Sequence, residues 1–291
     1  MSTLIDLHSH SHNSSDARAA NFSAYEMVEA AIRAGISIYS ITDHCEVNRF
    51  FSEAHYGGRM SEYKYETYDN GLDFEKSMAE NAECKIKIAD EKKNIKFLSG
   101  VELGQATLDF GLSESIISDR RLDFTLASVH QLDGLDDFAF IKYNEYSDDD
   151  LFALCEKYFC EVKKLCAWGK FDVLGHMTYI LRYIEGSAGR IVNINLFYEI
   201  IRECFKLLIH AGKGIEVNTS GLRQKYGKTL PDINVLKIYH DVGGKILTLG
   251  SDSHTPADVG KGISEASEMI KKIGFKWLVF YEKHEPHFIN I

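Results

Sequence analysis

Short apolar segments rich in β-branched residues alternate with longer segments of helical periodicity along the chain. The first kind predicts buried β-strands and the second predicts amphipathic helices. The predicted strands are residues 4–8, 36–43, 95–103, 122–130, 171–176, 214–218 and 245–252. The predicted helices are residues 23–35, with Ser23 as the N-cap and Gly35 past the end, and residues 74–93, 113–121, 149–168, 191–211, 233–242 and 257–273.

This alternation predicts parallel strands joined by right-handed crossovers, either in an open sheet or in a closed barrel. The residues at the strand ends decide between the two. Six of the seven predicted strands end on, or within two residues of, a potential metal ligand, and the seventh carries Glu216 and Asn218 there. Ligands from the two edge strands of an open sheet would lie far apart, whereas all strands of a barrel end around one mouth. The sequence therefore predicts an α/β barrel of about seven or eight strands.

Composition narrows the class of protein further. The chain has 291 residues, 45% of them hydrophobic, and only three prolines, with no linker rich in Pro, Gly or Ser, so residues 1–291 are predicted to form a single domain. The net charge of −10 argues against a general binder of nucleic acids or membrane surfaces.

No apolar run is long enough for a membrane span, and the first residues lack a signal-peptide pattern, so we expect a cytoplasmic protein. Six cysteines without a C-x-x-C pair are expected to be reduced thiols.

Three histidines, His8, His10 and His12, alternate at the first strand. They are either chance residues in a solvated segment or, because side chains two apart share a face of a strand, ligands that point at one ion. Each of the other histidines, taken alone, also has a structural interpretation. Their joint position at strand ends, together with carboxylates and without cysteine, favours a site for divalent first-row metals. The strand-end candidates are His8, His10, Asp43, His44, Glu102, His130, His176, Asp252 and His254, while His55, His210, His240, His284 and His287 are predicted to be surface or core residues.

The motifs DLHSHSH, ITDH, GVEL, SVH, GHMTY, EVNTSGLR and GSDSHTPADVG, in this order, resemble the PHP family, the polymerase and histidinol phosphatase superfamily. The resemblance covers nearly the whole chain. Within the superfamily, the length and the GH…LRY and NTSGLR segments are similar to the histidinol-phosphate phosphatases.

This resemblance implies a distorted TIM-like (β/α)₇ barrel with three divalent metal ions at the C-terminal ends of its strands. Zinc, manganese and iron all suit nitrogen and oxygen ligands of this kind. His12 has no matched place among the ligands. By resemblance, one ion would be held by His8, His10, Glu102 and Asp252, a second by Glu102, His130 and His176, and a third by Asp16, His44 and His254.

The resemblance also implies the activity, a metal-dependent hydrolysis of a small phosphomonoester, most closely L-histidinol phosphate. A hydroxide between two ions would attack phosphorus in line. Arg182 and Arg223 would bind the phosphate, since guanidinium groups recognise phosphate in a planar, bidentate way. The resemblance implies that Asp252, His254 and Glu102 are the catalytic residues; the leaving alcohol would receive its proton from Asp252, from His254 or from metal-bound water.

Other functions stay open at this point. The same metal centre could serve another small phosphomonoester, or a nucleic-acid diester, although a nuclease would want a basic groove. A metal-binding barrel without activity would be expected to have lost some ligands. Histidinol phosphate carries an ammonium group and an imidazole, so an acidic or aromatic contact is expected, with Glu46, Phe74 and Asp133 as candidates.

Overall fold

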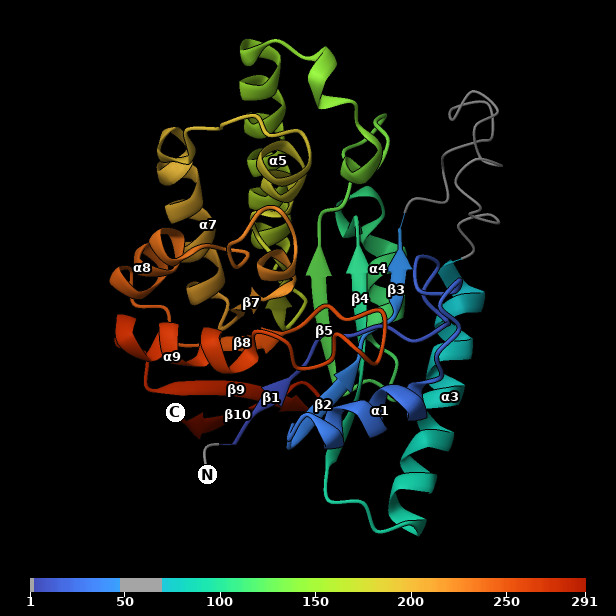
Figure 1. The fold of residues 1–291 in the computed structure, drawn as a ribbon. Coiled ribbons are helices and arrows are strands. Elements are labelled where there is room, and N and C mark those ends of the chain that lie inside the picture. Colours follow the sequence, from blue (N-terminus) through green and yellow to red (C-terminus); the bar gives the residue numbers. More distant parts are fainter. Residues whose placement is uncertain (1–2, 48–69) are drawn as a thin grey trace.

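Seven parallel strands form a nearly closed barrel in the computed structural model, which describes residues 3–47 and 70–291 (Figure 1). The strands neighbour one another in chain order, and the two ends of the series meet, because the Leu7 amide donates to the Leu249 carbonyl at 2.8 Å and the Asp252 amide to the His8 carbonyl at 2.7 Å. The predicted distorted barrel is thereby confirmed. Its strands are β1 (Ile5–Asp6), β2 (Ile38–Ile41), β4 (Lys96–Gly104), β5 (Phe124–Ser128), β6 (Val173–Leu174), β7 (Gly214–Asn218) and β8 (Leu247–Gly250).

Helices connect the strands and lie on the outside of the barrel (Figure 1). Short 3₁₀ segments and one π-helical turn complete the connections. The helices are α1 (Ala24–Arg33), α3 (Asn70–Asp90), α4 (Phe110–Ile117), α5 (Asp148–Trp168), α6 (Tyr179–Leu181), α7 (Tyr198–His210), α8 (Ile233–Asp241) and α9 (Ile263–Ile273).

The helix ends follow local sequence chemistry. Ser23 is the N-cap of α1, as predicted, and forms a capping box with Glu26, in which each side chain accepts from the other residue's backbone amide. Gly35 follows the helix with a φ of +75°, a left-handed conformation that costs glycine little. The periodic pattern of residues 23–35 therefore ends where the backbone reverses.

Most predicted helices differ from the observed ones by a few residues at their ends, as α4 (Phe110–Ile117) does from the predicted 113–121, and two contain a turn that the prediction missed. The prediction of a helix over 257–273 is wrong at its start, because Gly260 and Gly262 adopt positive φ values and α9 begins only at Ile263. The predicted helix over 191–211 is divided into a 3₁₀ segment (Ile194–Phe197) and α7. In both cases the apolar pattern continues across a turn that periodicity alone does not reveal.

Three further strands were not predicted. The short β3 (His44–Glu46) pairs in parallel with β4 beyond the end of β2. At the end of the chain, β9 (Trp277–Glu282) and β10 (Glu285–Asn290) form an antiparallel hairpin. Its turn residue His284 binds the Asp172 carboxylate at 2.7 Å, and its amide donates to the Asp123 carbonyl. Both aspartates directly precede barrel strands, so the hairpin packs at the end of the barrel opposite the carboxyl ends of the strands.

The buried apolar residues of the strands and of the inner helix faces form one connected cluster. The single-domain organisation of residues 1–291 stays a prediction, and His55 lies outside the described residues. In residues 3–47 and 70–291, no helix combines the length and the apolar character that crossing a bilayer requires.

Candidate metal centre

The nine residues predicted as metal ligands come together at the carboxyl ends of the barrel strands. They come from six strands or from the loops directly after them, so the barrel topology alone brings them to one mouth. His8, His10 and Asp16 follow β1, His44 begins β3, Glu102 lies in β4, His130 follows β5, His176 follows β6, and Asp252 and His254 follow β8.

Glu102 lies at the centre of the cluster and is fully buried. Its Oε1 lies 3.0 Å from Nε2 of His130 and 2.8 Å from Nε2 of His176. Its Oε2 lies 3.1 Å from Nε2 of His8. The two oxygens therefore face two different groups of histidines, which is the geometry of a carboxylate that bridges two ions.

Asp252 closes the β8 side of the cluster. Its Oδ1 lies 3.3 Å from Nε2 of His10 and 3.7 Å from Nε2 of His8. Its backbone has a φ of +53°, an uncommon conformation for a residue other than glycine. Strained backbone of this kind is typical of functional sites, and here it occurs at a residue that faces the cluster.

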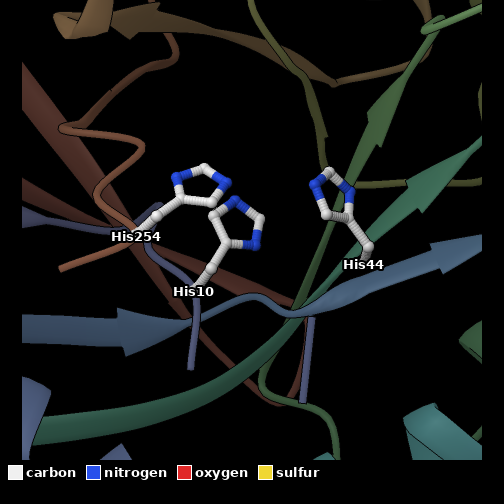
Figure 2. Close-up of side chains that lie close together, drawn as sticks. All are labelled: His10, His44 and His254. Carbon is white, nitrogen blue, oxygen red and sulfur yellow. The ribbon is translucent and has the colours of Figure 1, made fainter. Parts of the chain in front are cut away.

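A third group lies toward the open side of the mouth. Figure 2 shows His10, His44 and His254 close together, and the His10 ring lies 4.4 Å from the His44 ring and 4.3 Å from the His254 ring, measured between centroids. Asp16 lies between the two outer histidines, with its Oδ2 2.7 Å from Nε2 of His254 and 3.4 Å from Nε2 of His44.

These contacts form four overlapping groups whose donor atoms are close enough together to hold metal ions. All donors are imidazole nitrogens or carboxylate oxygens, a set that suits divalent first-row metals. The groups are His8, His10 and Asp252; His8, Glu102 and His176; His10, His44 and His254; and His44, Glu46 and His130.

The histidines of the metal-free cluster differ in charge. Burial acts to lower the pKa values of His8, His44, His130 and His254, but neighbouring carboxylates outweigh it and raise them, so metal ions that bind there must displace protons. Burial, together with the neighbouring His254 and His44, lowers the pKa of His10 to about 3, so this imidazole is neutral and has a lone pair for a metal ion. Burial acts to raise the pKa of Glu102, but nearby histidines, His8 and His44 first, outweigh it and hold the pKa well below its usual range. The central carboxylate is therefore ionised.

A set of acceptor side chains orients the histidines from behind. Glu216 of β7 accepts from Nδ1 of His8 at 2.6 Å, and both residues are fully buried. Nδ1 of His10 lies 2.9 Å from Oγ of Ser14, and Nδ1 of His130 lies 2.9 Å from Glu46. Such contacts set the tautomer and the ring orientation of a metal-binding histidine. Sequence reasoning placed Glu216 at a strand end but assigned it no role.

Asp43 was a strand-end candidate, yet its carboxylate turns toward the loop after β1. It accepts from the amide and hydroxyl of Ser11 and from the hydroxyls of Ser14 and Ser77. It therefore anchors the loop that carries His10 and is absent from the four donor groups.

His12 points away from the cluster, as its lack of a matched place predicted. Its Nε2 lies 2.9 Å from Glu80 of α3. Two of the three residues suggested for substrate contact also lie elsewhere, because Phe74 is part of the core and Asp133 is exposed outside the lining of the adjoining cavities. Glu46, the third, lines a cavity at the mouth.

The two predicted phosphate-binding arginines line a cavity of about 440 Å³ beside Asp252 and His254. Arg182 begins the π-helical turn Arg182–Ser187, and its Nη2 lies 2.9 Å from the Asp252 carboxylate. Arg223 donates to the Ser251 carbonyl at 2.8 Å. Nε of Arg182 and Nη1 of Arg223 are buried without a hydrogen-bond partner, so each guanidinium retains a donor for a ligand.

Comparisons with known proteins agree on one family. The PHP domain matches residues 6–220 of the chain. A probable histidinol-phosphatase of Thermotoga maritima is 27% identical over 277 residues, 94% of each chain, and one of Clostridium acetobutylicum is 30% identical over 201 residues, 68% of this chain and 76% of the relative.

A solved structure shares the fold. The histidinol phosphate phosphatase of Lactococcus lactis, in complex with zinc, L-histidinol and phosphate, aligns with a TM-score of 0.77 at 22% identity, over 99% of this chain and 100% of the other.

Proposed function

Because the chain belongs to the PHP domain family, we propose that it is a metal-dependent phosphomonoester hydrolase that converts L-histidinol phosphate and water to L-histidinol and phosphate. One observation carries this proposal. Histidine and carboxylate side chains whose donor atoms are close enough together to hold metal ions gather at one barrel mouth, beside Arg182 and the half-buried Arg223, each of which has one N–H without a hydrogen-bond partner. Support for the substrate comes from the curated relatives, which are named histidinol-phosphatases.

The residues fit three divalent ions. In this proposal the first is held by His8, His10, Glu102 and Asp252, the second by Glu102, His130 and His176, and the third by Asp16, His44 and His254. Their fit rests on the donor chemistry, on the neutral His10 and on the central Glu102, whose two oxygens face separate histidine groups. Such ions would lower the pKa of a bound water molecule to near neutral and would stabilise negative charge on phosphoryl oxygens.

The arginines bind the phosphoryl group in this proposal. A phosphate monoester is a dianion, and the chain is acidic overall, so local cations must compensate its charge. Arg182 and Arg223 line one cavity, and each has one N–H group without a hydrogen-bond partner. Asp252 also accepts from Arg182, so the guanidinium holds this carboxylate in place while it binds phosphate.

Proton transfer is assigned to the loop after β8. The leaving alkoxide takes a proton that comes from water, and Asp252 and His254, on this loop beside the phosphate cavity, lie where they could pass it on; Asp252 itself is ionised, because its pKa is held well below the usual range. Their mutual positions are set by the His254 Nδ1 contact to the Asp252 carbonyl at 3.1 Å. Glu102 acts with them by holding the cluster together.

We include a cytoplasmic location in this proposal. Its support is that all six cysteines are free thiols, as expected in a reducing compartment.

The test is release of inorganic phosphate from L-histidinol phosphate, from other small monoesters, from a simple diester and from an oligonucleotide, with zinc or manganese added. We expect hydrolysis of L-histidinol phosphate with the highest kcat/KM. The His176→Asn variant should lose activity and bound metal, whereas His240→Asn, at a half-buried histidine outside the cluster, should retain both. Hydrolysis of the diesters alone would contradict the proposal.

A further inference from the structure

In the part of the chain that the structure describes, two cavities adjoin the proposed metal cluster and share no lining residue. The one described above, which we call the cationic cavity, has a volume of about 440 Å³ and contains Arg182, Arg223 and Lys261. The other, which we call the acidic cavity, has a volume of about 220 Å³ and is lined by His44 and His130 of the cluster. A substrate bound at the metal cluster therefore has two different environments beside it.

The acidic cavity differs in its balance of charge, because the cationic cavity has Asp252 and Asp258 beside its three cations, whereas the acidic cavity has carboxylates alone among its lysine, arginine, aspartate and glutamate lining residues. Its lining includes the carboxylates of Asp16, Glu46 and Asp137, and no lysine or arginine is among its described lining residues. Tyr179, Tyr183 and Phe140 supply aromatic surface. An acidic pocket with aromatic walls suits a flat group that carries positive charge, because carboxylates and ring faces both attract cations.

Of these three carboxylates, Asp137 is the one that contacts none of the histidines of the proposed metal cluster. Asp16 contacts His254 and His44, and Glu46 contacts His44 and His130, so both are part of the metal cluster. Asp137 instead accepts from the Ala139 amide at 2.7 Å, where it caps the 3₁₀ segment Phe138–Phe140. Within the described residues no lysine, arginine or histidine lies within ion-pair distance of it, and burial raises its pKa to about 6.

Its position is fixed by the loop after β5. The Phe138 amide donates to the His130 carbonyl at 2.9 Å, which ties the Asp137 segment to the residue that faces the cluster. Tyr143 donates to the Phe138 carbonyl at 2.7 Å and holds the other side of the segment. The carboxylate is thus held on a rigid support, as a specificity contact requires.

We propose that the acidic cavity receives the alcohol part of the substrate, and that Asp137 is the counter-ion of its cationic nitrogen. This inference rests on the proposed function, in which the phosphoryl group lies in the cationic cavity. The substrate then spans the cluster, with its negative end toward Arg182 and its positive end toward Asp137. Tyr183 lies along the flat ring of the alcohol. The site therefore selects cationic alcohols over neutral ones of similar size.

The test compares the Asp137→Asn variant with the unaltered protein on two monoesters, L-histidinol phosphate and phenyl phosphate, whose alcohol is flat but neutral. Asparagine keeps the shape and an acceptor for the Ala139 amide, so only the charge is removed. Loss of a hydrogen bond to a charged group predicts a fall in kcat/KM of about 10- to 100-fold for L-histidinol phosphate. For phenyl phosphate the change should be less than about twofold. Asp133→Asn, in the same loop but exposed, is the matched control.

Binding of L-histidinol alone, measured by calorimetry, is the second readout and does not depend on hydrolysis. Asp137→Asn should weaken it by the same factor, and Tyr183→Leu should weaken it independently. An equal loss on both monoesters, or unchanged L-histidinol binding in both variants, would overturn the inference. If the unaltered protein hydrolysed neither monoester yet bound L-histidinol through Asp137, the proposed function would fail and this inference would stand.

Discussion

Glu216 provides the sharpest test of how the cluster is built, because it touches no predicted ion itself. Its Oε1 accepts from Nδ1 of His8 at 2.6 Å. Its Oε2 accepts from the His176 amide at 2.9 Å and from the Asn218 side chain at 3.2 Å. All three donors therefore need an oxygen acceptor. In Glu216→Gln, one oxygen becomes an NH₂ group. In either orientation of the amide, this NH₂ group lies opposite at least one N–H donor and cannot accept its hydrogen bond.

The expected magnitude follows from this mismatch. Glu216 and His8 are both fully buried, so water cannot replace the lost acceptor. A buried donor left unpaired costs about 1–3 kcal/mol, which corresponds to about 5- to 150-fold in an equilibrium constant. Removal of the partner behind a metal-binding histidine lowers metal affinity by about 10- to 100-fold. We therefore expect Glu216→Gln to weaken zinc binding by about 10- to 100-fold.

The assay is a titration of the metal-free protein with zinc in competition with a chromophoric chelator. Glu203→Gln is the matched control, since Glu203 makes an exposed ion pair with Lys163 on the outer helices. A circular dichroism spectrum and an unfolding curve establish that each variant is folded. If Glu216→Gln bound zinc with the affinity of the unaltered protein, the assignment of Glu216 as the residue that positions His8 would be wrong.

Three further predictions concern charge, phosphate and helix capping. The pKa of Asp137 in the folded chain, about 6, lies above its ordinary value of 3.8, so the folded state binds the proton more tightly and stability falls as pH rises through this window. Without metal, the Asp137→Asn variant should therefore have a free energy of unfolding about 2 kcal/mol higher than that of the unaltered protein above roughly pH 7, after allowance for solvent screening. Toward pH 4 the two proteins should be equally stable. Denaturant unfolding at a series of pH values measures both. Arg223→Ala should raise the inhibition constant of inorganic phosphate by about 10- to 100-fold without changing the metal content, because a charged donor is lost; unchanged inhibition would remove Arg223 from the phosphate site. Ser23→Ala should lower the free energy of unfolding by about 1 kcal/mol through loss of the α1 cap, and Ser115→Ala, an exposed serine on α4, should change it little in the same denaturant assay.

The sequence was informative about the barrel because its signals are local. Each strand is a short apolar run, and β7 begins and ends where the pattern predicted. The Ser23 cap and Gly35 lie within one helix length of each other. Strand-end histidines and carboxylates could be read directly, and one topological rule, that all parallel strands of a barrel end at one mouth, was enough to bring them together.

The elements that were missed depend on distant partners. β3 forms where His44–Glu46 pairs with the far half of β4. The strands β9 and β10 pair locally with each other, but the hairpin packs against the distant end of the barrel through His284. Asp43 and Asp252 both lie at strand ends, yet the Asp43 carboxylate binds Ser11 and does not face the cluster. Asp133 and Asp137 both lie in the loop after β5, yet Asp133 is exposed and Asp137 lines the acidic cavity.

The sequence by itself therefore determined the alternation of elements, the class of barrel and the kinds of side chain that end each strand, because these follow from periodicity and residue chemistry. Only the tertiary structure decided which acid supports which histidine and that, among the described residues, no lysine, arginine or histidine lies within ion-pair distance of Asp137 in the acidic cavity. Glu216 and His8 are 208 positions apart in the chain. Whether two such groups meet depends on strand twist and loop conformation, which set distances of a few ångströms that no local pattern encodes.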